Sequence, residues 1–173
     1  MSEKVCVIGL GYVGLPLAAL CASKGFQVIG YDKKQDIVDK TNQGICHIKD
    51  EKLQEYLDNT NGNLKATTNP EEIKDCTIYL ICVPTPVDEN KDPDLAPVEK
   101  SSETVSKYLK KGDLVVVEST IFPGTCEEIV VPILEKSGLK AGQDFYLAHC
   151  PERVNPGDVF WVTGNIPRVV GAL

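Results

Sequence analysis

The stretch Gly9-Leu10-Gly11-Tyr12-Val13-Gly14 decides the fold class of this chain. The apolar run from Lys4 to Ile8 precedes it and predicts a short buried strand. Apolar residues recur at helical spacing after it, and Gly25 is a suitable left-handed stop for that helix. The run from Gln27 to Tyr31 predicts a second strand. Strand, glycine turn, helix and strand together predict a βαβ unit.

The three glycines and the acid that follows the second strand suit a dinucleotide ligand. Gly9 permits the tight turn, Gly11 lets a pyrophosphate approach the backbone, and Gly14 lets the helix pack closely on the strand. Asp32 can accept hydrogen bonds from ribose hydroxyls and would repel a 2′-phosphate, so NAD is favoured over NADP. The Lys-Lys pair after Asp32 weakens that preference, because a nearby cation could hold the phosphate. A glycine turn that only packs is the alternative.

The rest of the chain alternates strands with helices. Helices are predicted at 36–43, 51–57, 98–109 and 125–137, and further strands at 64–68, 77–83, 114–118, 145–148 and 168–170. This alternation predicts an α/β fold with a doubly wound, mostly parallel sheet and helices on both faces, a Rossmann-like dinucleotide-binding fold. We expect a single domain that spans residues 1–173.

Ligands of such sheets bind outside the carboxyl ends of the strands, and most of the unusual residues fall there. Val83-Pro84-Thr85-Pro86 ends one strand, and Thr85 offers a hydroxyl on a backbone that two prolines restrict. Glu118-Ser119-Thr120 ends the next strand, where Thr120 could hold a water or a substrate oxygen. Glu152 follows another strand and is a candidate general base. A rigid turn, a surface threonine and a solvated glutamate are the alternatives.

Composition narrows the class of protein. A net charge of −7 argues against a nucleic-acid or acidic-membrane surface. The seven cysteines are odd in number and form no CxxC pair, so we expect free thiols, a cytoplasmic location and no metal site. The apolar run from Val5 to Ala22 could pass for a signal-peptide core, but its glycines and Pro16 favour strand, turn and helix. We assign no role to His47 and interpret His149 and Cys126 as structural.

Together these motifs resemble the UDP-glucose/GDP-mannose dehydrogenase family, specifically its N-terminal NAD-binding domain. Members of this family oxidise the C6 hydroxymethyl group of a nucleotide sugar to a carboxylate with two NAD, through a cysteine-bound thiohemiacetal and thioester. The matching segments occur in family order: Gly9-Leu10-Gly11-Tyr12-Val13-Gly14-Leu15-Pro16, Tyr31-Asp32, Val83-Pro84-Thr85-Pro86, Glu118-Ser119-Thr120 with Pro123-Gly124-Thr125, and Cys150-Pro151-Glu152-Arg153-Val154-Asn155-Pro156-Gly157.

The resemblance implies roles for individual residues. Val13, Thr85 and Thr120 would contact the nicotinamide side of NAD, and Glu152 would be the acid that assists thioester hydrolysis. Thr120 and Glu152 are therefore the candidate catalytic residues. The candidate NAD-binding residues are Gly9, Gly11, Tyr12, Val13, Gly14, Asp32, Val83, Pro84, Thr85, Ser119, Thr120 and Glu152.

The segment from Pro151 to Gly157 is closer to the UDP-N-acetylhexosamine branch of the family than to the UDP-glucose branch. The resemblance thus implies a UDP-ManNAc or UDP-GlcNAc 6-dehydrogenase of polysaccharide biosynthesis, with UDP-glucose as the alternative sugar. The family's nucleophilic Cys-x-Pro-Lys-Asp segment does not occur here, and the chain stops at Leu173, where the family continues. We expect an N-terminal fragment, inactive alone, without the middle dimerisation domain and the C-terminal UDP-binding domain. Its full-length parent would be a homodimer that binds the UDP-sugar mostly through those domains.

Two other hypotheses stay open. The chain could be a stand-alone NAD-binding regulatory module, which would need no chemistry from Thr120 or Glu152. It could also belong to another dehydrogenase with a similar first domain, such as a 6-phosphogluconate or hydroxyacyl-CoA type. The Val-Pro-Thr-Pro turn and the Pro-Glu-Arg run disfavour that last hypothesis.

Overall fold

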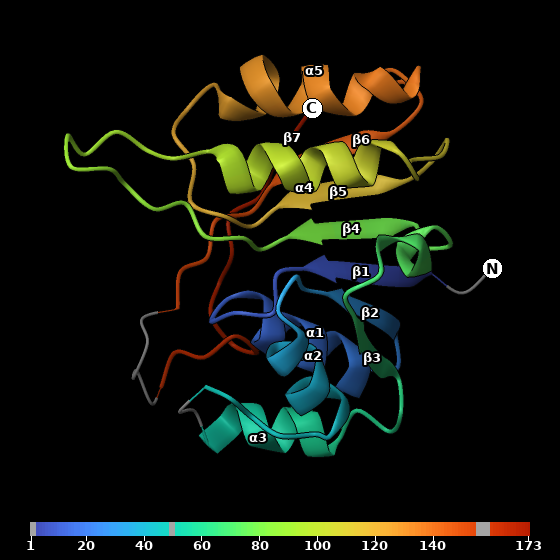
Figure 1. The fold of residues 1–173 in the computed structure, drawn as a ribbon, viewed down its shortest axis with the longest axis vertical. Coiled ribbons are helices and arrows are strands. Elements are labelled where there is room, and N and C mark those ends of the chain that lie inside the picture. The colour runs from blue at the N-terminus through green and yellow to red at the C-terminus, as the bar shows by residue number, and fades with distance from the viewer. Residues whose placement is uncertain (1–2, 49–50, 155–159) are drawn as a thin grey trace.

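The structure is a computed structural model that describes residues 3–48, 51–154 and 160–173 (Figure 1). The Asn155-Pro156-Gly157 part of the last family segment lies outside the described residues. The strands are β1 (Lys4–Ile8), β2 (Gln27–Tyr31), β3 (Leu64–Thr67), β4 (Ile78–Ile81), β5 (Leu114–Val117), β6 (Tyr146–His149) and β7 (Gly171–Ala172). The helices are α1 (Gly14–Ser23), α2 (Gln35–Asn42), α3 (Glu51–Asp58), α4 (Ala96–Ser106) and α5 (Val131–Leu134).

The strands of the described residues form one seven-stranded sheet in the order β3-β2-β1-β4-β5-β6-β7. Strands β1 to β6 run parallel, and β7 pairs antiparallel with β6. The chain builds outward from β1 in one direction through β2 and β3, and in the other through β4 and β5. The doubly wound, mostly parallel sheet predicted from the sequence is therefore confirmed, and its strand order reverses between β1 and β4.

Helices cover both faces of this sheet, as expected. The side chains of a strand alternate between its faces, and β1 shows the division. Val5 and Val7 pack into the core that contains α1 and α3, whereas Cys6 and Ile8 pack into the core that contains α4 and α5. In Figure 1 the parallel arrowheads point to the same side, and the long connection from β4 to α4 projects beyond them. The carboxyl ends of the strands and their loops therefore share one edge.

Two predicted elements differ from the structure. The predicted helix 125–137 is not one regular helix but a π-helical turn (Cys126–Val130), α5 and a 3-10 turn (Glu135–Ser137). Pro132 explains this irregularity, because it has no N–H to donate and its ring crowds the preceding turn. The predicted strand 168–170 is wrong, because pairing with β6 occurs only at Gly171 and Ala172. The Arg168 side chain instead binds two carboxylates.

No helix in the described part of the chain is long and apolar enough to cross a membrane. The seven cysteines are free thiols. The pKa of Cys126 is raised to about 11 by burial and by the neighbouring Glu127 charge, which suits the interpretation of this thiol as structural. His149 bonds through Nδ1 to the Val117 carbonyl at 2.8 Å, which suits the same interpretation of its ring.

Candidate functional site

The glycine turn joins β1 to α1, and its backbone packs closely against neighbouring backbone atoms at Gly9 and Gly14. Gly9 has φ +89°, and a Cβ placed on it would lie 2.7 Å from the Cys82 carbonyl oxygen. A Cβ on Gly14 would lie 1.8 Å from the Gly9 carbonyl oxygen, closer than any real contact. A Cβ on Gly11, by contrast, would meet nothing within 4 Å. The first and third glycines are thus required by the fold, and the second leaves the backbone open to a ligand.

Asp32 follows β2 and holds this turn through its carboxylate. Its Oδ2 accepts a hydrogen bond from the Leu10 N–H at 2.8 Å, and its Oδ1 accepts one from the Lys34 N–H at 2.9 Å. The Leu10 carbonyl in turn accepts a hydrogen bond from His47 Nε2 at 3.0 Å. The Leu10 peptide is therefore fixed on both sides. We assigned no role to His47 from the sequence, since nothing local places residue 47 beside residue 10.

A cleft of about 730 Å³ opens at this turn, where the strand order reverses between β1 and β4. One wall is the glycine turn with the ends of β2 and β4, and the other is α4. The predicted NAD-binding residues that line it are Gly9, Gly11, Tyr12, Val13, Asp32, Val83 and Pro84. Sequence reasoning missed the α4 wall, which consists of Pro97, Lys100, Ser101, Glu103, Thr104 and Lys107. A usable signal was their recurrence at helical spacing in the helix that follows β4.

The cleft fits an extended anionic dinucleotide. Its volume lies within the usual range for ligand sites, and Asp32 offers ribose acceptors at one end. Four lysines and two acids line it, so its local charge is positive in a chain whose net charge is −7. The four lysines include Lys33 and Lys34, the pair expected to weaken selection against a 2′-phosphate. The start of α1 adds backbone N–H groups and partial positive charge.

A second group of predicted residues, Thr85, Ser119 and Thr120, lies where β4 and β5 end and does not line the cleft. The Thr85 hydroxyl donates to the Thr120 carbonyl oxygen at 2.8 Å. The buried Ser119 hydroxyl donates to the Val83 carbonyl oxygen at 2.7 Å. These bonds join the two loops to each other, with the Thr120 side chain exposed. Among the predicted residues, Gly14 lies behind the turn, and Glu152 belongs to a third group.

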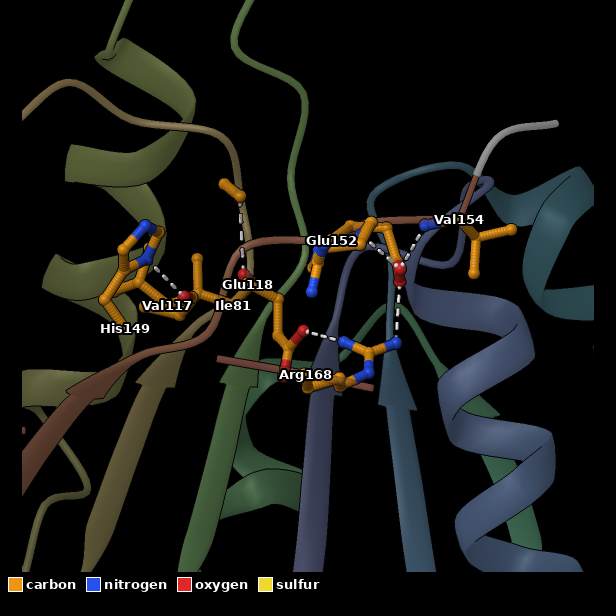
Figure 2. Close-up of polar contacts among 9 residues, drawn as sticks. Ile81, Val117, Glu118, His149, Glu152, Val154 and Arg168 are labelled. Carbon is orange, nitrogen blue, oxygen red and sulfur yellow. Dashed lines mark hydrogen bonds and ion pairs between the residues drawn. The ribbon is translucent and has the colours of Figure 1, made fainter. Parts of the chain in front are cut away.

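That third group is an acid–arginine cluster of Glu118, Glu152 and Arg168 (Figure 2). Arg168 donates through Nη1 to Glu118 Oε2 at 2.6 Å and through Nη2 to Glu152 Oε2 at 2.8 Å. The side chains of Glu118, Glu152 and Arg168 are 6%, 12% and 19% exposed. Glu152 Oε1 accepts the backbone N–H groups of Arg153 at 2.7 Å and Val154 at 2.9 Å. The sequence offered no signal that Arg168 would join the two acids.

Burial and mutual charge shift the pKa values around this cluster. Burial raises the pKa of Glu118, the Arg168 charge opposes that shift, and the Glu152 charge adds to it. The pKa of Arg168, which burial alone would lower, is held above its usual value by the two carboxylates. Cys82, which lines the cleft, has its pKa raised well above its usual range by burial and then by the Glu118 charge. The acid–arginine cluster therefore lies close enough to the cleft for its charges to act on Cys82 in the lining.

Fold and site together define a dinucleotide-binding domain of the Rossmann type. The sequence model of the "UDP-glucose/GDP-mannose dehydrogenase family, NAD binding domain" matches residues 3–173. The chain belongs to this family, as its NAD-binding domain. The resemblance found in the sequence motifs is thereby confirmed, and so is NAD as the cofactor.

Relatives and solved structures agree with this assignment. The chain is 41% identical to the UDP-N-acetyl-D-mannosamine dehydrogenase of Pyrococcus horikoshii, over 98% of this chain and 41% of that protein. It is 46% identical to a UDP-N-acetyl-D-glucosamine 6-dehydrogenase of Pseudomonas aeruginosa, over 96% of this chain and 39% of that protein. The chain thus spans about two fifths of the length of these curated relatives.

The structure of the Pyrococcus horikoshii UDP-D-ManNAc dehydrogenase superposes with a TM-score of 0.90 at 40% identity, over 98% of this chain and 41% of that one. A ternary complex of the Pseudomonas aeruginosa GDP-mannose dehydrogenase gives a TM-score of 0.84 at 34% identity, over 88% of this chain and 37% of that one.

Proposed function

We propose that this chain is the cofactor-holding part of an NAD-dependent UDP-N-acetylhexosamine 6-dehydrogenase, with UDP-glucose as the alternative sugar. The observation that carries the proposal is the cleft at the β1/β4 reversal, which joins the glycine turn, Asp32 and a cationic wall. The names of the relatives support the N-acetylhexosamine, because the two described above act on UDP-ManNAc and UDP-GlcNAc. The cofactor would supply the oxidising chemistry: two hydrides would leave C6 of the sugar in succession, one to each of two NAD molecules.

The turn and the start of α1 would hold the pyrophosphate. Gly9, Gly11, Tyr12, Val13 and Gly14 form this part, and Gly11 would give the closest approach because a Cβ placed on it would meet no described atom within 4 Å. Asp32 would accept the ribose hydroxyls with lone pairs that its two backbone hydrogen bonds leave available. Those backbone bonds fix the carboxylate before the cofactor arrives, which lowers the entropic cost of binding.

The ends of β4 and β5 would meet the nicotinamide side. Val83, Pro84, Thr85, Ser119 and Thr120 are joined there by two hydrogen bonds between their loops, so the Thr120 hydroxyl is carried on a fixed backbone. Thr120 would orient a water or a substrate oxygen. Glu152 would act as the acid or base that moves a proton during hydrolysis, and its carboxylate is already held by three donors.

The remaining proposals concern the longer protein. We place it in the cytoplasm, since free thiols suit a reducing compartment. We expect it to be a homodimer that binds the UDP-sugar mainly through residues beyond this chain. In the two relatives described above, about three fifths of the protein lies outside the part that this chain matches.

The test is an assay of the full-length gene product against UDP-GlcNAc, UDP-ManNAc and UDP-glucose, each with NAD and with NADP. The proposal expects NADH formation with one of the two N-acetylhexosamines, two NADH per sugar, and much slower reaction with NADP. The 173-residue chain alone should bind NAD and form no NADH. Absence of NADH formation from all three sugars would contradict the proposed activity, and sustained turnover by the short chain would contradict its role as a cofactor-holding part.

A further inference from the structure

The acid–arginine cluster brings together three segments that are far apart in the chain. Glu118 follows β5, Glu152 lies in the turn after β6, and Arg168 lies 50 residues beyond Glu118 in the segment that leads to β7. Figure 2 shows the guanidinium between the two carboxylates at the carboxyl end of the sheet. Three charges in so little solvent are costly to bury unless they compensate one another, so their arrangement calls for a physical reason.

We propose that Arg168 is a positioning residue for Glu152: its guanidinium, anchored on the buried Glu118 carboxylate, fixes the Glu152 carboxylate at the carboxyl end of the sheet. The inference rests on the proposed function only in assigning Glu152 to the reaction. The geometric claim about Arg168 stands on the contacts themselves and can be tested without substrate or cofactor.

Hydrogen-bond geometry gives the first argument. Both oxygens of Glu152 are engaged, Oε1 by two backbone N–H groups and Oε2 by Arg168. The backbone bonds come from the two residues that follow Glu152, so they fix one oxygen locally. Among the residues that the structure describes, Arg168 alone fixes the other oxygen from a different segment. The planar fork of arginine can reach two carboxylates at once, which a lysine ammonium on a flexible stem does less well.

Charge gives the second argument. Two carboxylates around one guanidinium leave a net charge of −1, and without Arg168 two like charges would face each other in little solvent. Among the described residues, the groups that act on Glu118 are Arg168 before β7 and Glu152 and Cys150 after β6, and Glu118 itself acts on Cys82 after β4 and on Cys21 of α1. Arg168 is the only cation in that set. Its removal should therefore raise the pKa of Glu118 further above its ordinary value.

The experiment follows the side-chain carboxyl carbon of Glu118 by NMR during a pH titration of the 173-residue chain. In the Arg168→Met variant Glu118 should titrate at a clearly higher pH than in wild type. In Arg168→Lys the midpoint of the Glu118 titration should return most of the way to the wild-type value. The matched control is Arg153→Met, because the Arg153 side chain donates to the Pro167 carbonyl and, among the described residues, forms no hydrogen bond or ion pair with either acid side chain. Equal midpoints in wild type and Arg168→Met would overturn the proposal.

Amide hydrogen exchange tests the orientation of Glu152 directly. In Arg168→Met the Arg153 and Val154 amides should exchange about tenfold faster, since the carboxylate that they bond is no longer held from across the cluster. In Arg168→Lys, which keeps the charge and loses the fork, the same amides should still exchange faster while the Glu118 midpoint stays near wild type. If Arg168→Met does not fold, Arg168→Lys decides, and wild-type exchange in that variant would overturn the proposal.

NAD affinity of the same samples separates this inference from the proposed function. None of the three cluster residues lines the cleft, so NAD should bind wild type and Arg168→Lys equally well. A wild-type chain that fails to bind NAD would contradict the proposed function and leave the positioning role standing. A chain that binds NAD but keeps its Glu118 midpoint in Arg168→Met would contradict the positioning role alone.

Discussion

The two halves of the ligand-binding edge are built in different ways. The glycine-turn half, with the turn and Asp32, comes from one continuous stretch of chain and depends on the absence of side chains and on backbone hydrogen bonds. The acid half, with Glu118, Glu152 and Arg168, comes from three distant segments and depends on buried charge. The first half has the shape to hold a cofactor, and the second has groups that can move protons.

This difference has a practical consequence for mutagenesis. Substitutions in the glycine-turn half should change cofactor affinity or abolish packing, and should leave the ionisation of the acid half alone. Substitutions of Glu118 or Arg168 in the acid half should change stability and its pH dependence, and should leave cofactor affinity unchanged. Variants in each half therefore test whether cofactor affinity and buried charge are independent of each other.

Gly14→Ala should have the largest effect. The added methyl group would lie 1.8 Å from the Gly9 carbonyl oxygen, so β1 and α1 would have to move apart. We expect a loss of at least about 3 kcal/mol of stability, measured by urea denaturation, together with loss of NAD binding. Native stability in this variant would show that the close contact between α1 and the turn is not needed.

Arg168→Met should destabilise the chain by about 3–5 kcal/mol, the usual cost of removing one partner from a buried ion pair. The pKa of Glu118 is already raised by burial, and loss of Arg168 raises it further. As the pH falls, Glu118 therefore takes up a proton at a higher pH in the folded variant than in the unfolded chain. Stability of the variant therefore falls as pH rises between the unfolded and folded pKa values of Glu118.

The deficit of Arg168→Met against wild type should accordingly be smaller at about pH 5 than at about pH 7, as measured by denaturation at both pH values. A deficit that grows on acidification would refute the assignment of this charge to Glu118.

Asp32→Asn should weaken NAD binding by about 10- to 100-fold, because the neutral amide loses charged hydrogen bonds to the ribose. Titration calorimetry measures the effect. Asp36→Asn is the matched control, since it makes the same substitution at an exposed side chain of α2. Asp36 forms only an ion pair with Lys40 at 3.8 Å there. Equal losses in both variants would point to net charge rather than to a ribose contact.

Gly11→Ala should have the smallest effect. A Cβ there meets nothing within 4 Å, so stability should stay within about 0.5 kcal/mol of wild type. NAD affinity should fall by about tenfold, because the methyl group stands where the pyrophosphate approaches the backbone. Unchanged affinity would contradict the proposed path of the cofactor across the turn.

The same division explains what the sequence could predict. Strand β2 was predicted at its observed bounds, and β1, α1 and the glycine turn follow from local pattern and from the requirement for small residues. Residues 168–170 were predicted as a strand because two valines follow Arg168. Strand pairing, however, depends on where β6 ends in the folded sheet, and local sequence does not give that position. Pro132 is a local signal for an irregular helix after Thr125, and the prediction of one helix over 125–137 did not take it into account.

The contacts within the acid half could not be predicted from local sequence. Glu118 and Glu152 were each recognisable as acids after strands, but nothing near either residue indicates that Arg168 joins them. The α4 wall of the cleft was less predictable than the glycine turn and more predictable than the acid half. Its residues recur at helical spacing, and the strand-order rule would have pointed to them once β4 was placed beside β1.

The most direct test of the account is titration calorimetry of the 173-residue chain with NAD and NADP, with Asp32→Asn measured in parallel. We expect NAD to bind, NADP to bind more weakly, and Asp32→Asn to reduce the difference in affinity between the two cofactors. No NAD binding, or tighter binding of NADP than of NAD, would contradict it.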